Sequence, residues 1–253
     1  MKKQFLILAC SVLALTACKN ENKEKEEEKS PNENKEMAQE NNENNEWISL
    51  FNGKNLEGWK VYGKDSISDQ WQVKDGAIVF VPSEKEKSAE NLITKEQFTS
   101  FELSLDWKIS EGGNSGVMYA VQDNPEKYSE PYMTGPEIQI LDNQRHPDAK
   151  NGPNRTAGAL YDLYPPSKDV TKPAGEWNHE VIRIDHENNQ GSVTLNGTKI
   201  VEFPAHGPDW DKQVENSKFK DWEGFGKNRT GHIALQDHGH KVWFKDIKIK
   251  PLD

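Results

Sequence analysis

Cysteine is nearly absent from this chain, which has only Cys10 and Cys18 among its 253 residues. Both lie in the first 18 residues, so no thiol occurs in the rest of the chain. Disulfide bonds, zinc–thiolate sites and a cysteine nucleophile are therefore excluded from everything that follows residue 18.

The chain also lacks an apolar run long enough to span a bilayer as a helix, which needs about 20 residues. Its apolar N-terminal stretch, residues 5–15, follows two lysines and precedes Leu15-Thr16-Ala17-Cys18. These are the three parts of a secretory signal. We expect residues 1–17 to be a lipoprotein signal peptide and Cys18 to become lipidated; a plain secretory signal is the alternative.

Residues 19–46 contain no aromatic and no β-branched residue, only a polar mixture rich in Glu, Lys and Asn. Such a segment cannot bury enough apolar surface to offset the entropy lost on ordering. We therefore interpret residues 18–46 as the lipidated cysteine and a disordered tether. Lys19 with the acidic residues after it resembles the surface-export signal of Bacteroidota lipoproteins, so the expected location is the outer membrane, on either its periplasmic or its cell-surface face.

All eight tryptophans lie from Trp47 onward, which predicts a folded domain over residues 47–253. About 200 residues suit one domain with a sizeable core. The chain carries a net charge of −10, and the seven Lys and ten Glu of residues 1–46 leave −7 on the domain. An acidic domain argues against nucleic acid as a partner and is compatible with neutral ligands such as sugars.

Apolar and polar residues alternate with a period of two through the domain, as in Phe101–Ile109. Asp75-Gly76 and Asn196-Gly197 are hairpin signals, because their turns need positive φ at both central residues. A change of phase at Lys245-Asp246 suggests a β-bulge. The pattern predicts an all-β fold, an antiparallel two-sheet sandwich of jelly-roll type.

Polar residues occupy an unusual position in the segment 135–142. Its isoleucines are placed to fill a core, while Glu137 and Gln139 project from the opposite face of the strand. A bulge at Leu141 would bring Asp142 to the same side. A solvated sheet face would explain this segment if it stood alone.

Three further segments favour a functional face. They carry Asn114 and Ser115 after a Gly-rich turn, Tyr161 in a small-residue strand, and Gln236, Asp237 and His238 after a core strand. A concave polar face lined by aromatic rings is typical of sugar-binding sites. Trp177, Trp210 and Trp222 lie in loop-like contexts and are the candidate stacking residues.

The seven histidines raise the question of a metal. His146 follows the Glu137 strand, and His232, His238 and His240 are close in sequence. They do not share one predicted element in a metal-binding spacing, so the pattern gives a divalent cation little support and leaves it as an open possibility.

Eight segments, in order along the domain, resemble the 3-keto-disaccharide hydrolase domain family, also described as 3-keto-glucoside 1,2-lyase/3-keto-2-hydroxy-glucal hydratase. The resemblance covers nearly all of residues 47–253. One departure is Lys245-Asp246, where the family usually has Arg-Asn. The matching segments are 50–59, 71–76, 114–117, 137–142, 158–166, 175–178, 195–197 and 231–239.

This resemblance implies a concanavalin-A-like jelly roll that cleaves 3-keto-glycosides. A keto group at C3 acidifies the hydrogen at C2, so a base can remove it, the C1 substituent can leave and water can add to the glucal. The reaction needs a base, an acid and donors at the developing enolate oxygen. A sugar 3-dehydrogenase in the same pathway could supply the substrate.

The residues available for these roles follow from the same resemblance. Glu137 is expected as base or metal ligand and His238 as acid or oxyanion partner. The full acid–base set is Glu137, Asp142, His146 and His238, and the expected substrate contacts are Asn114, Ser115, Gln139, Tyr161, Trp177, Gln236 and Lys245.

Two other functions stay open. A retaining glycosidase of laminarinase type carries Glu-x-Asp-x-x-Glu on one strand, where this chain has Glu137-x-Gln139-x-x-Asp142. Such an enzyme needs two carboxyl groups about 5–5.5 Å apart. A non-catalytic carbohydrate-binding module is the other alternative, because sandwich folds host many lectins.

Overall fold

The computed structural model describes residues 46–83 and 90–252. The predicted signal peptide, the lipidation site Cys18 and nearly all of the predicted tether lie outside the described residues. Among the described residues, no helix is both long and apolar enough to cross a membrane.

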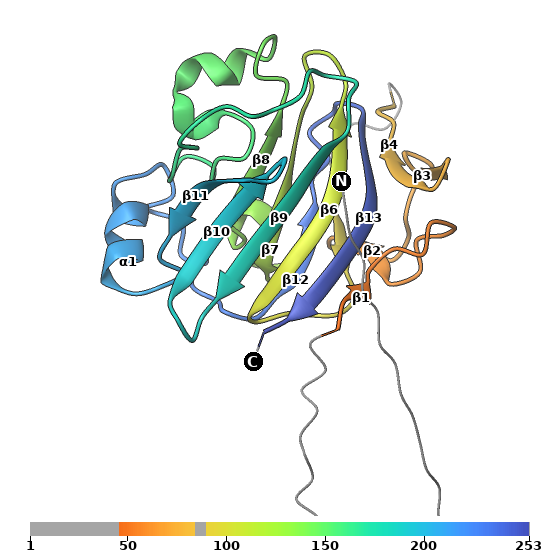
Figure 1. Cartoon of the computed structure of the whole chain (residues 1–253). Coiled ribbons are helices and arrows are strands. Elements are labelled where there is room, and N and C mark those ends of the chain that lie inside the picture. The colour runs from red at the N-terminus through yellow and green to blue at the C-terminus, as the bar shows by residue number, and fades with distance from the viewer. Residues whose placement is uncertain (1–45, 84–89, 253) are drawn as a thin grey trace, which may run out of the picture. The chain divides into compact units, whose positions relative to one another are not determined.

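The larger of two sheets has eight antiparallel strands in the order β11-β10-β9-β6-β13-β4-β3, with β1 paired to β13. In Figure 1 most of these strands form the front layer. Their bounds are β1 Ile48–Ser49, β3 Trp71–Lys74, β4 Ala77–Phe80, β6 Phe101–Ile109, β9 Asn178–Asp185, β10 Gln190–Leu195, β11 Thr198–Phe203 and β13 Val242–Pro251.

The smaller sheet has five antiparallel strands in the order β2-β5-β12-β7-β8 and forms the layer behind (Figure 1). Between the two sheets lies one large apolar core, in which Trp59 and Trp107 are fully buried. This arrangement confirms the predicted antiparallel jelly-roll sandwich. The bounds are β2 Trp59–Val61, β5 Leu92–Thr94, β7 Asn114–Val121, β8 Glu137–Leu141 and β12 His232–Leu235.

The local turn signals are confirmed. Asp75 and Gly76 join β3 to β4 with φ of 50° and 73°, and Asn196 and Gly197 join β10 to β11 with φ of 49° and 78°. The pairing of β13 with β6 shifts register after Lys245, where the bulge was expected.

Short helices lie in the connections: η1 Pro131–Met133, η2 Pro147–Asn151, η3 Pro153–Arg155 and the α-helix α1 Pro208–Glu215. The loop-like interpretation of Trp210 was wrong, because this residue lies in α1 and is buried in the core. A helix of eight residues makes too few turns for its apolar period to be recognised in the sequence.

Candidate active site

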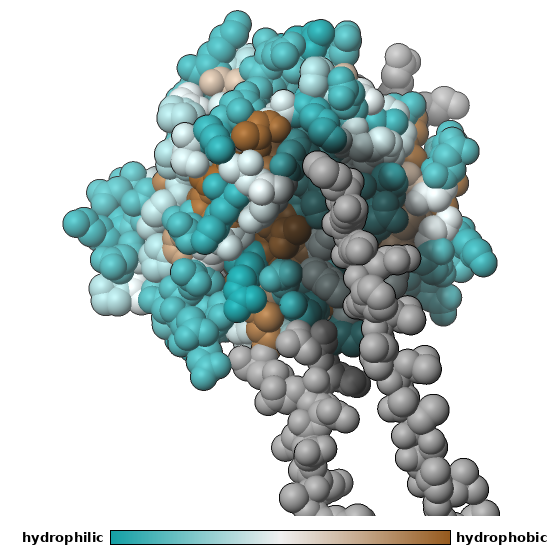
Figure 2. Space-filling view, viewed as in Figure 1, coloured by the Kyte–Doolittle hydropathy of each residue, from teal (hydrophilic) through white to brown (hydrophobic). Residues whose placement is uncertain are grey.

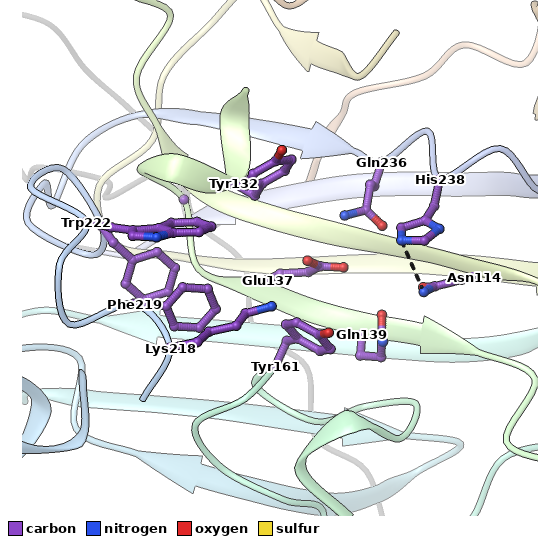
Figure 3. A pocket seen from close by; sticks show the side chains of 12 residues that line it. Asn114, Tyr132, Glu137, Gln139, Tyr161, Lys218, Phe219, Trp222, Gln236 and His238 are labelled. Carbon is purple, nitrogen blue, oxygen red and sulfur yellow. Dashed lines mark hydrogen bonds between the residues drawn. The ribbon is translucent and has the colours of Figure 1, made fainter. Parts of the chain in front are cut away.

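A cavity of about 370 Å³ lies over the outer face of the five-stranded sheet, above β7, β8 and the end of β12. Loops 153–161 and 217–226 bring further side chains to it. Figure 3 shows the lining side chains. They are Asn114, Tyr132, Gly135, Glu137, Gln139, Tyr161, Lys218, Phe219, Trp222, Phe225, Gln236 and His238.

Strand alternation places Glu137 at the centre of the cavity. Ile138 and Ile140, its neighbours on β8, are fully buried in the core, so Glu137 and Gln139 project outward. On the adjacent strand β7, Gly116 leaves room for the glutamate: a Cβ atom there would stand 2.1 Å from Glu137 Oε1. A residue without a side chain at position 116 is thus a condition for the position of the carboxyl group.

The carboxyl group of Glu137 titrates far from its ordinary range. Burial raises its pKa to about 8, while the positive charge of Lys218 and a hydrogen bond from the Gln236 side chain act in the opposite direction. The negative charge of Asp148 adds to the increase. A carboxyl group with a pKa near neutrality can accept and return a proton during a reaction.

Lys218 is a cavity residue that the sequence analysis did not identify. Its ammonium group lies 4.2 Å from the centroid of the Tyr161 ring and 5.1 Å from that of Phe219. Burial and the nearby charge of Arg155 lower the pKa of Lys218, and the carboxylates of Asp162 and Glu137 partly oppose this shift. No motif marks the segment in sequence, so only the folded loop reveals the contact.

An ion-pair network fixes the loop that carries Tyr161. Arg155 donates to Asp162 at 2.9 and 2.6 Å and to the Tyr161 hydroxyl at 2.9 Å. The same hydroxyl donates to Asp148 at 3.0 Å. The segment around Tyr161 forms a turn with two isolated bridges at Leu160, to Ile138 and to Tyr164, rather than the expected strand. Burial and Asp148 raise the pKa of the Tyr161 phenol, which therefore stays protonated.

Three buried amide oxygens face the cavity and have no hydrogen-bond partner among the described residues: Asn114 Oδ1, Gln139 Oε1 and Gln236 Oε1. Buried polar atoms are nearly always hydrogen-bonded in folded proteins. These acceptors would be satisfied by the hydroxyl groups of a bound ligand. Ser115, by contrast, is fully buried and donates to the Gln236 carbonyl oxygen at 2.8 Å, so it supports this end of β12 from outside the lining.

Three histidines lie close together near these amides, and one of them, His238, lines the cavity. His238 Nε2 lies 3.4 Å from Asn114 Nδ2, and the ring centroids of His146, His238 and His240 are 5.6 to 6.3 Å apart. Burial and the neighbouring His238 lower the pKa of His146 and of His240. Within residues 46–83 and 90–252, no set of three or more His, Cys, Asp or Glu side chains is arranged to hold a metal ion.

Asp142 lies outside the cavity lining. Its carboxylate accepts hydrogen bonds from the backbone N–H of Gly112 at 2.8 Å and of Gln144 at 3.1 Å, and from Arg145 at 3.2 Å. Burial would raise its pKa, but these donors together hold the pKa below the ordinary value. The geometry is that of a carboxylate that fixes the end of β8.

Trp177 and Lys245 lie on the other sheet. The ammonium group of Lys245, on β13, is 4.7 Å from the Trp177 ring centroid, and that of Lys108, on β6, is 4.9 Å from it. Both strands belong to the eight-stranded sheet, whereas the cavity lies over the five-stranded one. Figure 2 shows the molecule from the side of the eight-stranded sheet, where most residues are hydrophilic. Trp222, the other expected stacking residue, does line the cavity.

Comparisons with known proteins find relatives over most of the folded domain. The sequence model of one protein family, the 3-keto-alpha-glucoside-1,2-lyase-like domain, matches residues 46–250. A 3-keto-disaccharide hydrolase of Bacteroides thetaiotaomicron is 37% identical over 232 residues, covering 82% of this chain and 79% of that protein.

Solved structures of two candidate glycosyl hydrolases from Parabacteroides distasonis are also similar. One is 34% identical with a TM-score of 0.74 and covers 82% of this chain and 94% of its own. The other is 30% identical with a TM-score of 0.62, over 82% of this chain and 100% of its own. This chain belongs to the family of 3-keto-alpha-glucoside-1,2-lyase-like domains.

Proposed function

We propose that this protein cleaves 3-keto-glycosides by base-catalysed 1,2-elimination followed by hydration of the glucal. The observation that carries the proposal is Glu137, the one carboxyl group in the cavity lining within the described part of the chain, with a pKa raised to about 8. The name of the Bacteroides relative, 3-keto-disaccharide hydrolase, supports the same substrate class.

The chemistry requires little more than a base, a proton donor and a site for negative charge. Glu137 removes the C2 proton, and the C–H electrons form an enolate whose charge lies on the C3 oxygen. The enolate then collapses: the C3 carbonyl re-forms, C1 and C2 become double-bonded, and the C1–O bond breaks as the leaving group takes a proton. Water adds across C1=C2, so the net reaction is hydrolysis to a 3-keto sugar and an alcohol.

The order of groups along the cavity matches the order of reacting atoms in the sugar. Figure 3 shows Lys218 on one side of Glu137, with His238 and Asn114 on the other. With C2 over Glu137, His238 and Asn114 stabilise the C3 oxygen, and Lys218, an acid strengthened by its lowered pKa, protonates the oxygen on C1. Lys218→Met should therefore slow the release of poor leaving groups, with Lys220→Met as the matched control.

A retaining glycosidase finds less support. It needs two carboxyl groups about 5–5.5 Å apart on either side of the bond. Gln139 stands where the laminarinase pattern has its second carboxylate. Asp142 accepts hydrogen bonds from Gly112 and Arg145 and lies outside the cavity lining. A pure sugar-binding module finds less support because Glu137, with its raised pKa, lies in the cavity lining, and shifted carboxyl pKa values cluster at catalytic sites.

The test compares phenyl 3-keto-glucoside with phenyl glucoside as substrates of the purified protein. We expect phenol to be released from the keto sugar alone. Glu137→Gln should lower kcat at least about 100-fold through loss of the base, whereas Glu57→Gln, at an exposed position, should leave it unchanged. Release from both glucosides would indicate a glycosidase, and an active Glu137→Gln variant would remove Glu137 from the mechanism.

A 3-keto substrate has to be made by oxidation at C3 of an ordinary glycoside. We therefore propose that a sugar 3-dehydrogenase precedes this protein in the pathway. Supplying that dehydrogenase together with an unoxidised glucoside should restore aglycone release in the same assay. No release under those conditions, with the keto product detected, would contradict the coupling.

A further inference from the structure

Aromatic rings gather at one end of the cavity. The rings of Tyr132 and Trp222 lie 5.7 Å apart at 40°, and both line the cavity. Tyr132 is 37% exposed although it is a large hydrophobic residue, and Trp222 is half-buried. Behind them Phe219 stacks on Phe225 with a centroid distance of 3.9 Å and an angle of 9°, and Trp222 packs edge-on against Phe219 at 5.1 Å.

The opposite end of the cavity is polar. Figure 3 shows Asn114, Gln236 and His238 at that end, Tyr132, Phe219 and Trp222 at the other, and Glu137 between them. The unpartnered amide oxygens at the polar end need hydroxyl groups, and the aromatic end instead offers ring faces. A ligand that satisfies both ends has one hydroxyl-rich part and one flat, apolar part.

We propose that Tyr132 and Trp222 form the binding subsite for the leaving group and select glycosides whose leaving group contains a ring. Suitable groups are a second pyranose, which presents an apolar face of C–H bonds, and an aromatic aglycone. The inference rests on the proposed function, because it takes the 3-keto ring to occupy the polar end.

The chemistry and the size of the cavity agree with this assignment. Lys218, the proposed acid for the leaving group, contacts Phe219 at the aromatic end. The volume of about 370 Å³ lies near the lower limit of small-molecule sites, roughly 300–1,000 Å³. That space suits a ligand of two rings rather than a polymer chain.

The subsite also has the rigidity that stacking needs. Phe219 and Phe225 are both buried and support Trp222 from within the fold. A ring held by packing loses little conformational entropy when a ligand stacks on it. The aromatic end is therefore prepared for its ligand before binding.

The experiment measures kcat/KM for phenyl and methyl 3-keto-glucosides of the same anomeric configuration. The quantity of interest is the phenyl-to-methyl ratio in a variant divided by that in the wild type, since intrinsic leaving-group reactivity cancels. Trp222→Ala should lower this ratio about three- to tenfold, the range expected for one lost aromatic contact. Trp177→Ala, a half-buried tryptophan on the other sheet, is the matched control and should leave the ratio unchanged.

Tyr132→Ala provides a second test, because truncating a partly exposed side chain leaves the core intact. It should lower the ratio in the same direction as Trp222→Ala. An unchanged ratio in both variants would overturn the subsite.

Failure of the proposed function can be distinguished from failure of the subsite. If the wild type released neither aglycone, calorimetric binding of unoxidised phenyl and methyl glucosides would still test the subsite. We expect phenyl glucoside to bind more tightly to the wild type, and Trp222→Ala to remove the difference. Equal affinities of the wild type for the two ligands would overturn the subsite whatever the reaction is.

Discussion

At the residue scale, Glu137 depends on its neighbours for both its position and its charge. The raised pKa follows from burial, which penalises the carboxylate, and from the proximity of Asp148. Lys218 and Gln236 moderate the shift, so the group stays within reach of ionisation near neutral pH. The space that it fills exists because position 116 has no side chain.

Gly116→Ala should therefore abolish most activity without unfolding the domain. The added methyl group overlaps the Glu137 carboxyl, which is the end of a flexible side chain and can move aside. We expect kcat to fall at least about tenfold because the base is displaced, while the urea midpoint changes little.

Gly53→Ala is the control for this prediction. Residue 53 has a φ of 75° with open space around it, so alanine there strains the backbone far from the cavity. This variant should lose about 1 kcal/mol of stability and keep its activity. A fully active Gly116→Ala protein would show that the Glu137 carboxyl is not needed where the structure has it.

At the element scale, turns and bulges could be predicted from the sequence, whereas the pairing of distant strands could not. Positive φ at Asn196-Gly197 and the bulge after Lys245 follow from nearby residues alone. The sheet to which a strand belongs depends on contacts far along the chain. Lys245 and Trp177 therefore resembled site residues in sequence, although Lys245 lies on β13 and the Trp177 ring lies beside it, on the sheet away from the cavity. Lys218 was not identified because it lies in a loop, where no periodic pattern marks a site residue.

Strand β9 contains a second acid, Glu180, that the sequence analysis did not single out. It faces the core between Leu105 and Leu195 and is 0% exposed. Burial raises its pKa to about 8, and the Trp107 indole offsets part of the effect. Since the folded state holds this proton more tightly than the unfolded state, stability is fully present below pH 4.5 and is lost as the pH rises through about 8.

Glu180→Gln should remove this pH dependence, because the amide is neutral at every pH. We expect the variant and the wild type to differ little in unfolding free energy at pH 5, and the variant to be more stable by about 2–4 kcal/mol at pH 9. Urea unfolding at the two pH values measures the difference. If the difference in unfolding free energy between the variant and the wild type were the same at pH 5 and pH 9, Glu180 would titrate normally in the folded protein.

At the scale of the whole molecule, the sandwich separates its two outer faces. The five-stranded sheet carries the cavity, and the eight-stranded sheet carries a row of lysines and tryptophans that includes Lys108, Trp177 and Trp243. The fold class was predictable because strand alternation and turn residues repeat along the whole domain. The cavity was predictable only in part, because β8 supplies Glu137 and Gln139 in a recognisable pattern and the loops supply the rest.

We also propose that the whole chain is held at the outer membrane by a lipid on Cys18, which the order Leu15-Thr16-Ala17-Cys18 supports. Expression of the full chain and of Cys18→Ser in a Gram-negative host tests this. Mass spectrometry should find a mature N-terminus at an acylated Cys18, and the variant should leave the membrane fraction. An unmodified cysteine, or a variant retained in the membrane, would contradict the anchor.

The central claim is that Glu137 removes the hydrogen at C2 of a 3-keto sugar. The most direct measurement compares phenyl 3-keto-glucoside carrying hydrogen or deuterium at C2, under conditions where chemistry limits the rate. We predict slower phenol release from the deuterated substrate in the wild type and loss of most release in Glu137→Gln. Equal rates from both substrates, together with release of phenol from the unoxidised glucoside, would contradict elimination and favour a glycosidase.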